Sequence, residues 1–418
     1  MMQDFFPDGM PIAAWFYDDS EPALPVLGQP YVATAYGVAA DGTVQTEALQ
    51  RLIDHIAKEG GGVLVIPEGT FLTGALFFRQ GVHLHIMPGG VLLGSDDISD
   101  YPVLPTRIEG ESCTNFAALI NADGLDGFTM TGEGVIDGNG LRAWKAFWLR
   151  RRWNPKCTNK DEQRARLVYL SDCSNVTVSG LTMRNPQFWT NHLYRCDHVR
   201  YLGVNIEVPT EGVKAPSSDA LDIDACHDVL VKGCRLQVND DSIVLKGGKG
   251  PWADTAPENG SNERILIEDC EYAFCHGCLT CGSESVHNRN VILRNCRVGY
   301  ASNLLWLKMR PDTPQRYEYI RVEGMSGFVR NVVYIQPWLQ FFDLKGREDA
   351  PMSYADQVTL TDCDLDCENY FNVSARPDQY ELSRFTLRDL TIRAKTDGYA
   401  DGLIRDAVVE NVHVTLVE

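Results

Sequence analysis

Nine segments of the chain repeat one pattern of apolar residues, and this repeat limits the folds open to the sequence. Each segment reads apolar, x, apolar, x, x, apolar, x, apolar, as in Val176-Val178-Leu181-Met183. A period of two is typical of strands, and the segments begin 22 to 38 residues apart. Such recurrence, with the length variation confined to loops, predicts an all-β solenoid, so 418 residues can form one elongated domain. The other segments begin at Val199, Val229, Ile265, Val291, Ile320, Val358, Phe385 and Ala407.

The stretch before the repeat is organised differently. Residues 1–30 are rich in proline and aromatic residues and have no period, so we expect an extended arm, with residues 31–418 forming a single domain. Residues 46–58 have apolar residues at helical spacing, which predicts a helix that caps the N-terminal end of the solenoid. Short strands are expected after this helix, at residues 63–66, 76–78 and 82–86.

The charge of the chain excludes some classes of partner. A formal net charge of −19 argues against nucleic acid, whose phosphates need a basic surface. No apolar stretch approaches the roughly 20 residues that cross a bilayer, so we expect no membrane partner. The N-terminal residues include acids and no basic region, unlike a signal peptide. We therefore expect a cytoplasmic protein, with secretion or periplasmic export after removal of a leader as the alternative.

Most of the 13 cysteines are expected to be small buried hydrophobic residues. At the third apolar position of the repeat, cysteine alternates with leucine, valine and methionine. Disulfides are the weaker alternative. His276 lies among Cys275, Cys278 and Cys281, but structural zinc normally draws its ligands from two separated knuckles. We therefore predict no metal there and expect these thiols to point into the core.

Two acidic clusters lie on either side of one repeat segment. They are 219–224, which contains three aspartates, and Asp240-Asp241. If the 21 positions from Asp219 to Asp240 make one turn of the solenoid, the clusters stack on strands about 4.8 Å apart. Crowded carboxylates raise the pKa of one member, and a protonated carboxyl beside ionised ones suits glycoside hydrolysis. Turn residues and calcium-binding loops are the simpler alternatives.

Four short motifs, in order along the chain, resemble those of glycoside hydrolase family 28, the polygalacturonase-like enzymes. They are Ser217-Ser218-Asp219, Asn239-Asp240-Asp241, Cys275-His276-Gly277 and Trp306-Leu307-Lys308. The first keeps only the acid of the family motif, and the last has tryptophan where the family has arginine. The resemblance covers most of the chain and implies a right-handed, single-stranded parallel β-helix.

The resemblance also implies roles for individual residues. Asp240 would be the general acid, and Asp219 and Asp241 would hold and deprotonate the attacking water, which gives inversion. His276 would orient the acid, and Lys308 would bind a substrate carboxylate as a point charge. Inverting enzymes keep acid and base roughly 6.5–9.5 Å apart, which adjacent coils can provide. No metal or other cofactor is required.

The substrate is less constrained than the catalytic acids. Trp306 cannot clamp a carboxylate as arginine does, although its ring can stack on a sugar. Arg310, which lies on the same strand face as Lys308, is one candidate replacement; otherwise this subsite takes rhamnose or another neutral sugar. Asn191 and His192 are weaker candidates for sugar contact.

Two further stretches concern the substrate. The loop 247–263 resembles that of family members that remove single units from chain ends. Residues 142–166 concentrate basic charge and are either a solvated loop or a funnel for an anionic oligosaccharide.

We therefore predict an exo-acting hydrolase that releases α-linked galacturonic acid from the non-reducing end of pectic chains. One alternative is a family member that acts on rhamnogalacturonan or a neutral sugar. Others are a calcium-dependent pectate lyase and a non-catalytic carbohydrate-binding solenoid. The expected partner is a pectic polysaccharide or oligosaccharide, and the sequence leaves the oligomeric state open.

Overall fold

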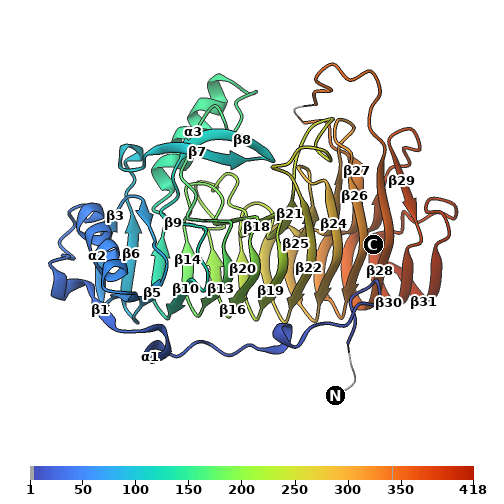
Figure 1. Cartoon of the computed structure of the whole chain (residues 1–418). Coiled ribbons are helices and arrows are strands. Elements are labelled where there is room, and N and C mark those ends of the chain that lie inside the picture. Colours follow the sequence, from blue (N-terminus) through green and yellow to red (C-terminus); the bar gives the residue numbers. More distant parts are fainter. Residues whose placement is uncertain (1–3, 341) are drawn as a thin grey trace.

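The computed structural model describes residues 4–340 and 342–418. Twenty-nine of the strands in these residues stack into one sheet whose registered strand pairs are parallel. The chain winds through this stack as a right-handed parallel β-helix (Figure 1), which confirms the predicted fold. No helix in the described residues is long and apolar enough to cross a membrane.

The first half of each of the nine repeat segments forms one face of the β-helix and the second half forms the next, with the apolar positions of successive coils in register. Val176 pairs with Val199, and Val199 pairs with Val229. Their side chains belong to one core cluster that extends along the β-helix. Fully burying one such side chain stabilises the fold by about 1.5–3 kcal/mol. The strands are β13 (Ser174–Ser179), β16 (Asp197–Leu202), β19 (His227–Lys232), β22 (Ser261–Glu268), β24 (His287–Arg294), β26 (Arg316–Glu323), β28 (Ser353–Val373), β30 (Thr386–Thr396) and β31 (Val408–Leu416).

Two residues with positive φ bend each repeated coil. One directly precedes the repeat, such as Asn175 with φ 53°, and the other precedes its third apolar position, such as Gly180 with φ 69°. The left-handed region turns the chain sharply, and glycine, asparagine and aspartate enter it most easily. The first bends are Asn175, His198, Asp228, Arg264, Asn290, Tyr319, Gln357, Arg384 and Asp406. The second bends are Gly180, Gly203, Gly233, Asp269, Asn295, Gly324, Asp362, Asp389 and Asn411.

The remaining strands of the coils complete the other faces. Within the long strands β23 and β25, the chain passes from one face to the next. Strands β14 (Thr182–Arg184), β17 (Asn205–Glu207) and β20 (Arg235–Gln237) contain the last apolar position of the first three repeats. Strands before or between the repeats are β1 (Pro30–Val32), β2 (Gly62–Ile66), β3 (Gly69–Thr73), β5 (Val82–Ile86), β6 (Gly90–Gly94), β10 (Thr129–Gly132), β11 (Val135–Asp137) and β29 (Tyr380–Ser383). The site face consists of β4 (Leu76–Phe77), β9 (Ile120–Asp123), β12 (Val168–Ser171), β15 (Asn191–Tyr194), β18 (Leu221–Asp224), β21 (Ile243–Lys246), β23 (Glu271–Cys281), β25 (Arg297–Met309) and β27 (Ser326–Pro337).

Helix α2 (Thr46–Lys58) has the predicted bounds and lies at the N-terminal end of the β-helix (Figure 1). The three short strands predicted after it are also confirmed, to within one residue at each end. Two elements on the side of the site face were not predicted. They are helix α3 (Leu141–Trp153) and an antiparallel hairpin of β7 (Val103–Ile108) and β8 (Glu111–Phe116).

The N-terminal arm runs along the outside of the β-helix, from its C-terminal coils towards its N-terminal end (Figure 1). It includes the short helix α1 (Leu24–Leu27). Phe6, Ile12 and Phe16 are buried against an outward-facing apolar stripe. Asp8 also forms an ion pair with Arg289 at 2.9 Å. The stripe consists of Leu202, Leu230, Leu266 and Ile292.

The cysteines behave as predicted. All 13 are free thiols, and all but Cys113 are buried. Cys275, Cys278 and Cys281 lie in the main core cluster, whereas His276, on the same strand, is partly exposed.

Candidate active site

A cavity of about 190 Å³ opens on the site face, where α3, the hairpin tip and later loops meet. Asp219, Asp240, Asp241 and Lys308 all line it, so the structure brings together residues that lie far apart in the sequence. The lining also includes Glu109, Phe147, Arg151, Trp189, Lys246, Glu284 and Trp338.

The three aspartates form one compact cluster. An oxygen of each carboxylate lies within 4.8 Å of those of the other two. Leu221 pairs with Ile243, so one turn is a residue longer than predicted and Asp219 aligns with Asp241, not Asp240. The nearest carboxylate oxygens are also closer than the roughly 6.5–9.5 Å expected between acid and base. The reason is that the acids come from neighbouring strands, which lie about 4.8 Å apart.

The surroundings of these carboxyls give them different pKa values. Burial, together with the charges of Asp240 and Asp222, raises the pKa of Asp219 well above its usual range. Burial also disfavours the anion of Asp240. The hydrogen bond and charge of His276, with the charges of two lysines, outweigh this effect and lower the pKa of Asp240 to about 2. Within the cluster, Asp219 is therefore the carboxyl that holds a proton more strongly than Asp240.

His276 contacts the more accessible of the acids. Its Nδ1 lies 3.5 Å from Oδ1 of Asp240, and its backbone N–H donates to the Asp240 carbonyl at 2.9 Å. Nε2 lies 3.2 Å from Nζ of Lys214. These contacts hold the imidazole beside the Asp240 carboxylate.

Lys308 lies between an acid and two aromatic rings. Its ammonium donates to Oδ2 of Asp241 at 2.7 Å and lies 4.1 Å from the ring centroid of Trp306. The ring of Trp338 is 4.8 Å from the same ammonium. Such cation–π contacts favour the charged lysine. Trp306 thus contacts Lys308 directly, while Trp338, which the sequence interpretation did not select, lines the cavity.

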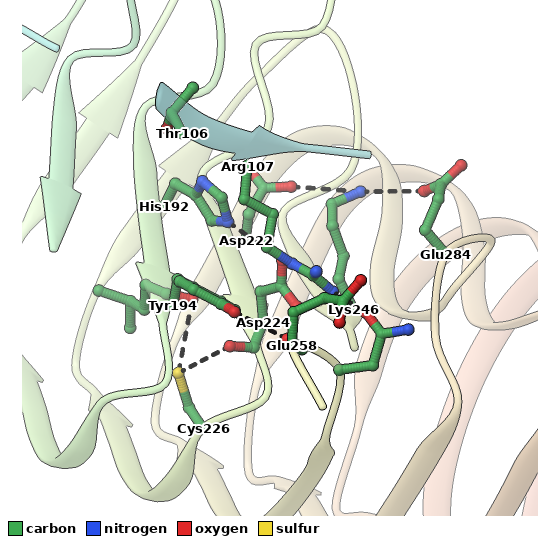
Figure 2. Close-up of polar contacts among 12 residues, drawn as sticks. Thr106, Arg107, His192, Tyr194, Asp222, Asp224, Cys226, Lys246, Glu258 and Glu284 are labelled. Carbon is green, nitrogen blue, oxygen red and sulfur yellow. Dashed lines mark hydrogen bonds and ion pairs between the residues drawn. The ribbon is translucent and has the colours of Figure 1, made fainter. Parts of the chain in front are cut away.

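Lys246 is a second cationic residue of the cavity that was not assigned from the sequence. Figure 2 shows its ammonium between Asp222 and Glu284, at 3.4 Å from each carboxylate. The ammonium also lies 4.6 Å from the Trp189 ring centroid. The available signal was a lysine at the end of an otherwise apolar strand, because a buried charge requires partners.

Four predicted substrate contacts do not line the cavity, namely Trp306, Arg310, Asn191 and His192. Arg310 is fully buried, and its guanidinium binds Asp312 through two hydrogen bonds of 2.7 Å. The prediction that Arg310 replaces the missing arginine is therefore wrong, because its guanidinium is bound to Asp312 and does not line the cavity. Asn191 is buried and donates to the Ala220 carbonyl at 3.0 Å. His192 is also fully buried, beneath the hairpin.

The hairpin is held down on the site face by buried charges. Nε of Arg107 donates to Asp224 at 2.7 Å, and Nε2 of His192 lies 3.4 Å from the same carboxylate (Figure 2). Arg166 donates to the Thr106 hydroxyl at 2.6 Å. The hairpin thus crosses the site face at β15 and β18.

The far end of the hairpin is joined to three other segments. Glu111 lies 2.5 Å from Lys160, 3.1 Å from Lys345 and 3.9 Å from Lys249. Burial disfavours its anion, but the three lysines outweigh that effect and lower the pKa of Glu111 to about 2. Glu111 therefore links the walls beside the cavity.

Two groups of the described residues have atoms close enough to share a cation. In one of them the ammonium of Lys308 already contacts Asp241, and in the other Arg264 binds both oxygens of Asp228. Positive side chains thus take up part of each set of potential ligands. The groups are Asp219 with Asp240 and Asp241, and Asp197 with His198 and Asp228.

The fold has close counterparts among solved structures. The chain superposes on a hyperthermoactive exopolygalacturonase from Thermotoga maritima with a TM-score of 0.73, 22% sequence identity and 91% coverage of both chains. A polygalacturonase from Erwinia carotovora gives a TM-score of 0.68 at 18% identity, covering 90% of this chain and 94% of that one.

Sequence comparison points in the same direction. A probable polygalacturonase from Vitis vinifera is 29% identical over 56% of this chain and 46% of its own length. An exo-poly-α-D-galacturonosidase from Dickeya chrysanthemi is 25% identical over 63% of this chain and 50% of its own. The chain thus spans about half the length of these curated relatives. The model of glycosyl hydrolases family 28 matches residues 105–320, just over half of the chain and including every residue of the aspartate cluster. The chain therefore belongs to glycosyl hydrolases family 28.

Proposed function

We propose that this protein is an inverting exo-hydrolase that releases α-linked galacturonic acid from the non-reducing end of pectic chains. The observation that carries the exo mode is the hairpin β7–β8, which crosses the site face beside the aspartate cluster. Its tip residue Glu109 lines the cavity. A second cavity of about 540 Å³, lined by Thr106, Tyr169 and Tyr194, lies along the same face. A chain that entered the first cavity would meet the hairpin before it reached the second.

Three cations favour a uronate over a neutral sugar in the cavity. Arg151, Lys246 and Lys308 line it in a protein with a net charge of −19. Lys308 would bind the carboxylate of one sugar beside the scissile bond. These side chains offer individual positive contacts to an anionic substrate that the net charge of the whole protein would repel.

Asp240 serves as the general acid in this proposal. It is the least buried of the three aspartates and has His276 beside it. Asp219 and Asp241 hold the attacking water and take up its proton. Direct attack of that water on the anomeric carbon breaks the glycosidic bond in one step, with inversion, while the acid protonates the leaving oxygen.

Substrate binding would prepare Asp240 for this role. The charges of Lys308 and Lys214 are among the causes that lower its pKa in the free site. A uronate carboxylate bound at Lys308 neutralises part of that charge, and the sugar excludes water from the carboxyl. Both changes raise the pKa of Asp240 and favour transfer of the cluster's proton to it.

The test is the product profile of polygalacturonate digestion. We expect monomer to be the sole early product, released with an inverted anomeric configuration that NMR detects. Early release of mixed oligomers would contradict the exo mode. A rise in ultraviolet absorbance from unsaturated product, abolished by a chelator, would indicate calcium-dependent elimination instead of hydrolysis.

A further inference from the structure

We propose that the outer surface of α3 binds the part of a polyuronate chain that extends beyond the cavity. This inference rests on the proposed function, because it assumes an anionic polysaccharide as substrate. It adds a binding surface outside the catalytic cavity. The surface consists of Lys145, Leu149, Arg152, Trp153 and Lys156.

Residues 141–156 carry six basic residues and no acidic one. Arg150 forms an ion pair with Glu162 at 2.9 Å, and Arg142 lies 3.7 Å from Asp96. The other four cations have no carboxylate within 4.0 Å in the part of the chain that the structure describes. They are Lys145, Arg151, Arg152 and Lys156. An acidic protein thus presents four uncompensated cations on α3 and the three residues that follow it, and a polyanion complements them.

Apolar side chains lie on the same surface. Trp153 is 85% exposed and Leu149 is 57% exposed. With Lys145 they are four residues apart in sequence, and so lie along one side of the helix. An exposed indole offers a flat apolar face on which a sugar ring can stack while adjacent cations bind its carboxylate. Alternating apolar and cationic groups match the alternating faces and charges of a polyuronate.

The surface continues from the catalytic cavity. Phe147 and Arg151 line the cavity from the other side of the helix, and Arg151 directly precedes Arg152 of the surface, so the two adjoin at the C-terminal end of α3. The inner side of α3 is anchored by Trp144, which donates to the Pro186 carbonyl at 2.8 Å, and by Trp148, which donates to the Lys214 carbonyl at 2.7 Å. Helix α3 is therefore a platform joined to the site. This continuity favours a polyuronate over an anionic membrane as the occupant.

The test compares KM for oligogalacturonides of two to ten units. In the wild-type protein we expect KM to fall about tenfold as the chain lengthens, equivalent to one or two extra charge contacts. Arg152→Glu with Lys156→Glu, and separately Trp153→Ala, should abolish this fall. The dimer ends within the cavity, so its KM should change less than twofold. Added salt should weaken the length effect, because these contacts are exposed.

The control is the same charge reversal on another helix, Arg51→Glu in α2, which should keep the wild-type length dependence. If the α3 variants keep the wild-type dependence of KM on chain length, the inference is wrong. It is also wrong if the wild-type protein binds anionic lipid vesicles and the α3 variants lose only this vesicle binding. If the wild-type protein hydrolyses no oligomer, the proposed function fails. The affinity of Asp240→Asn for a ten-unit chain, with and without the α3 changes, then tests the surface by itself.

Discussion

The aspartate cluster combines groups that hold a proton with different strength. The pKa of Asp219 is raised and the pKa of Asp240 is lowered, although their carboxylates are close neighbours. The difference comes from His276 and the lysines, which contact Asp240 and Asp241 rather than Asp219. The identity of the acid in the reaction is therefore controlled by charges that a bound uronate can modify.

Replacing the proposed acid should remove catalysis without affecting the fold. We expect Asp240→Asn to lower kcat by about 10²–10⁴-fold, the usual contribution of a general acid. The melting temperature should be unchanged or slightly lower, because the contacts with His276 and the lysines that favour the Asp240 anion are lost with its charge. Steady-state kinetics and thermal unfolding measure the two effects. Full activity of the variant would contradict the assignment.

Lys246 should be important for stability because it balances a buried acid. Burial raises the pKa of Asp222 and favours its neutral form, whereas the ammonium of Lys246 is the main cause that overcomes burial and lowers the pKa of Glu284. Lys246→Met should thus lower the free energy of unfolding by about 3–5 kcal/mol, the cost of leaving a buried charge unpaired.

A second substitution provides the check on this effect. Glu284→Gln in the Lys246→Met background should recover part of the lost stability, because it removes the unpaired anion. Denaturant unfolding of the two single variants and the double variant forms a double-mutant cycle. Strictly additive losses would show that the pair does not interact.

The residues of the candidate active site were only partly predictable from the sequence. The three aspartates could be selected because they interrupt apolar strands in a known order of motifs. Trp189, Glu284 and Lys246 enter the cavity because the coils stack, and their contacts depend on a register that differs by one residue from the predicted turn.

At the scale of elements, the hairpin β7–β8 shapes the cavity through one buried ion pair. Arg107→Met should release the hairpin from Asp224 and open the site face. We expect early digestion products to shift from monomer to a mixture of oligomers, as chromatography would show. Arg388→Met, which cuts an exposed ion pair with Glu410 on a distant coil, is the matched control. A purely monomeric product from Arg107→Met would contradict this role of the hairpin.

The ion pairs of Glu111 make the stability of the hairpin depend on pH, and the direction of this dependence follows from the pKa of Glu111. Its pKa in the folded protein, about 2, lies below its usual value of 4.5. The stabilisation is therefore complete above pH 4.5 and is lost as the pH falls through about 2. The difference in melting temperature between wild type and Glu111→Gln should be constant from neutral pH to about 5 and then shrink. A difference that grew on acidification would contradict the assigned ion pairs.

The bends of the coils show what local sequence can and cannot reveal. The second bend of every repeat is glycine, asparagine or aspartate, so turn chemistry could have located it. The first bend includes Arg264, Tyr319 and Gln357, whose types carry no such signal. Stacking between coils imposes the left-handed conformation there. The hairpin and α3 were missed for a related reason: their anchors are buried ion pairs and tryptophans between segments distant in sequence.

At the scale of the whole molecule, the coil was predictable from its repeat, but the partner of the N-terminal arm was overlooked. Leu230, Leu266 and Ile292 stand in register at an outward position of the repeat, where Arg200 and Arg321 stand in coils on either side. Three successive apolar residues at that position were a visible signal that something covers this surface.

The arm should stabilise the β-helix without taking part in catalysis. Phe6→Asp with Phe16→Asp should detach it and expose the apolar stripe. We expect the melting temperature to fall by about 5 °C, the effect of roughly 4 kcal/mol in a protein of 418 residues and close to the value of burying two phenylalanine side chains. Binding of a hydrophobic dye should rise, while activity at low temperature stays unchanged because the arm contacts a different face. An unchanged melting temperature would contradict this role.

The arm also has a consequence for the order of assembly. Residues 4–16 leave the ribosome long before residues 202–292, which build the stripe they cover. During synthesis these residues have no surface to bind until several coils have stacked. The arm thus docks late, and it can dock only after the central coils have formed.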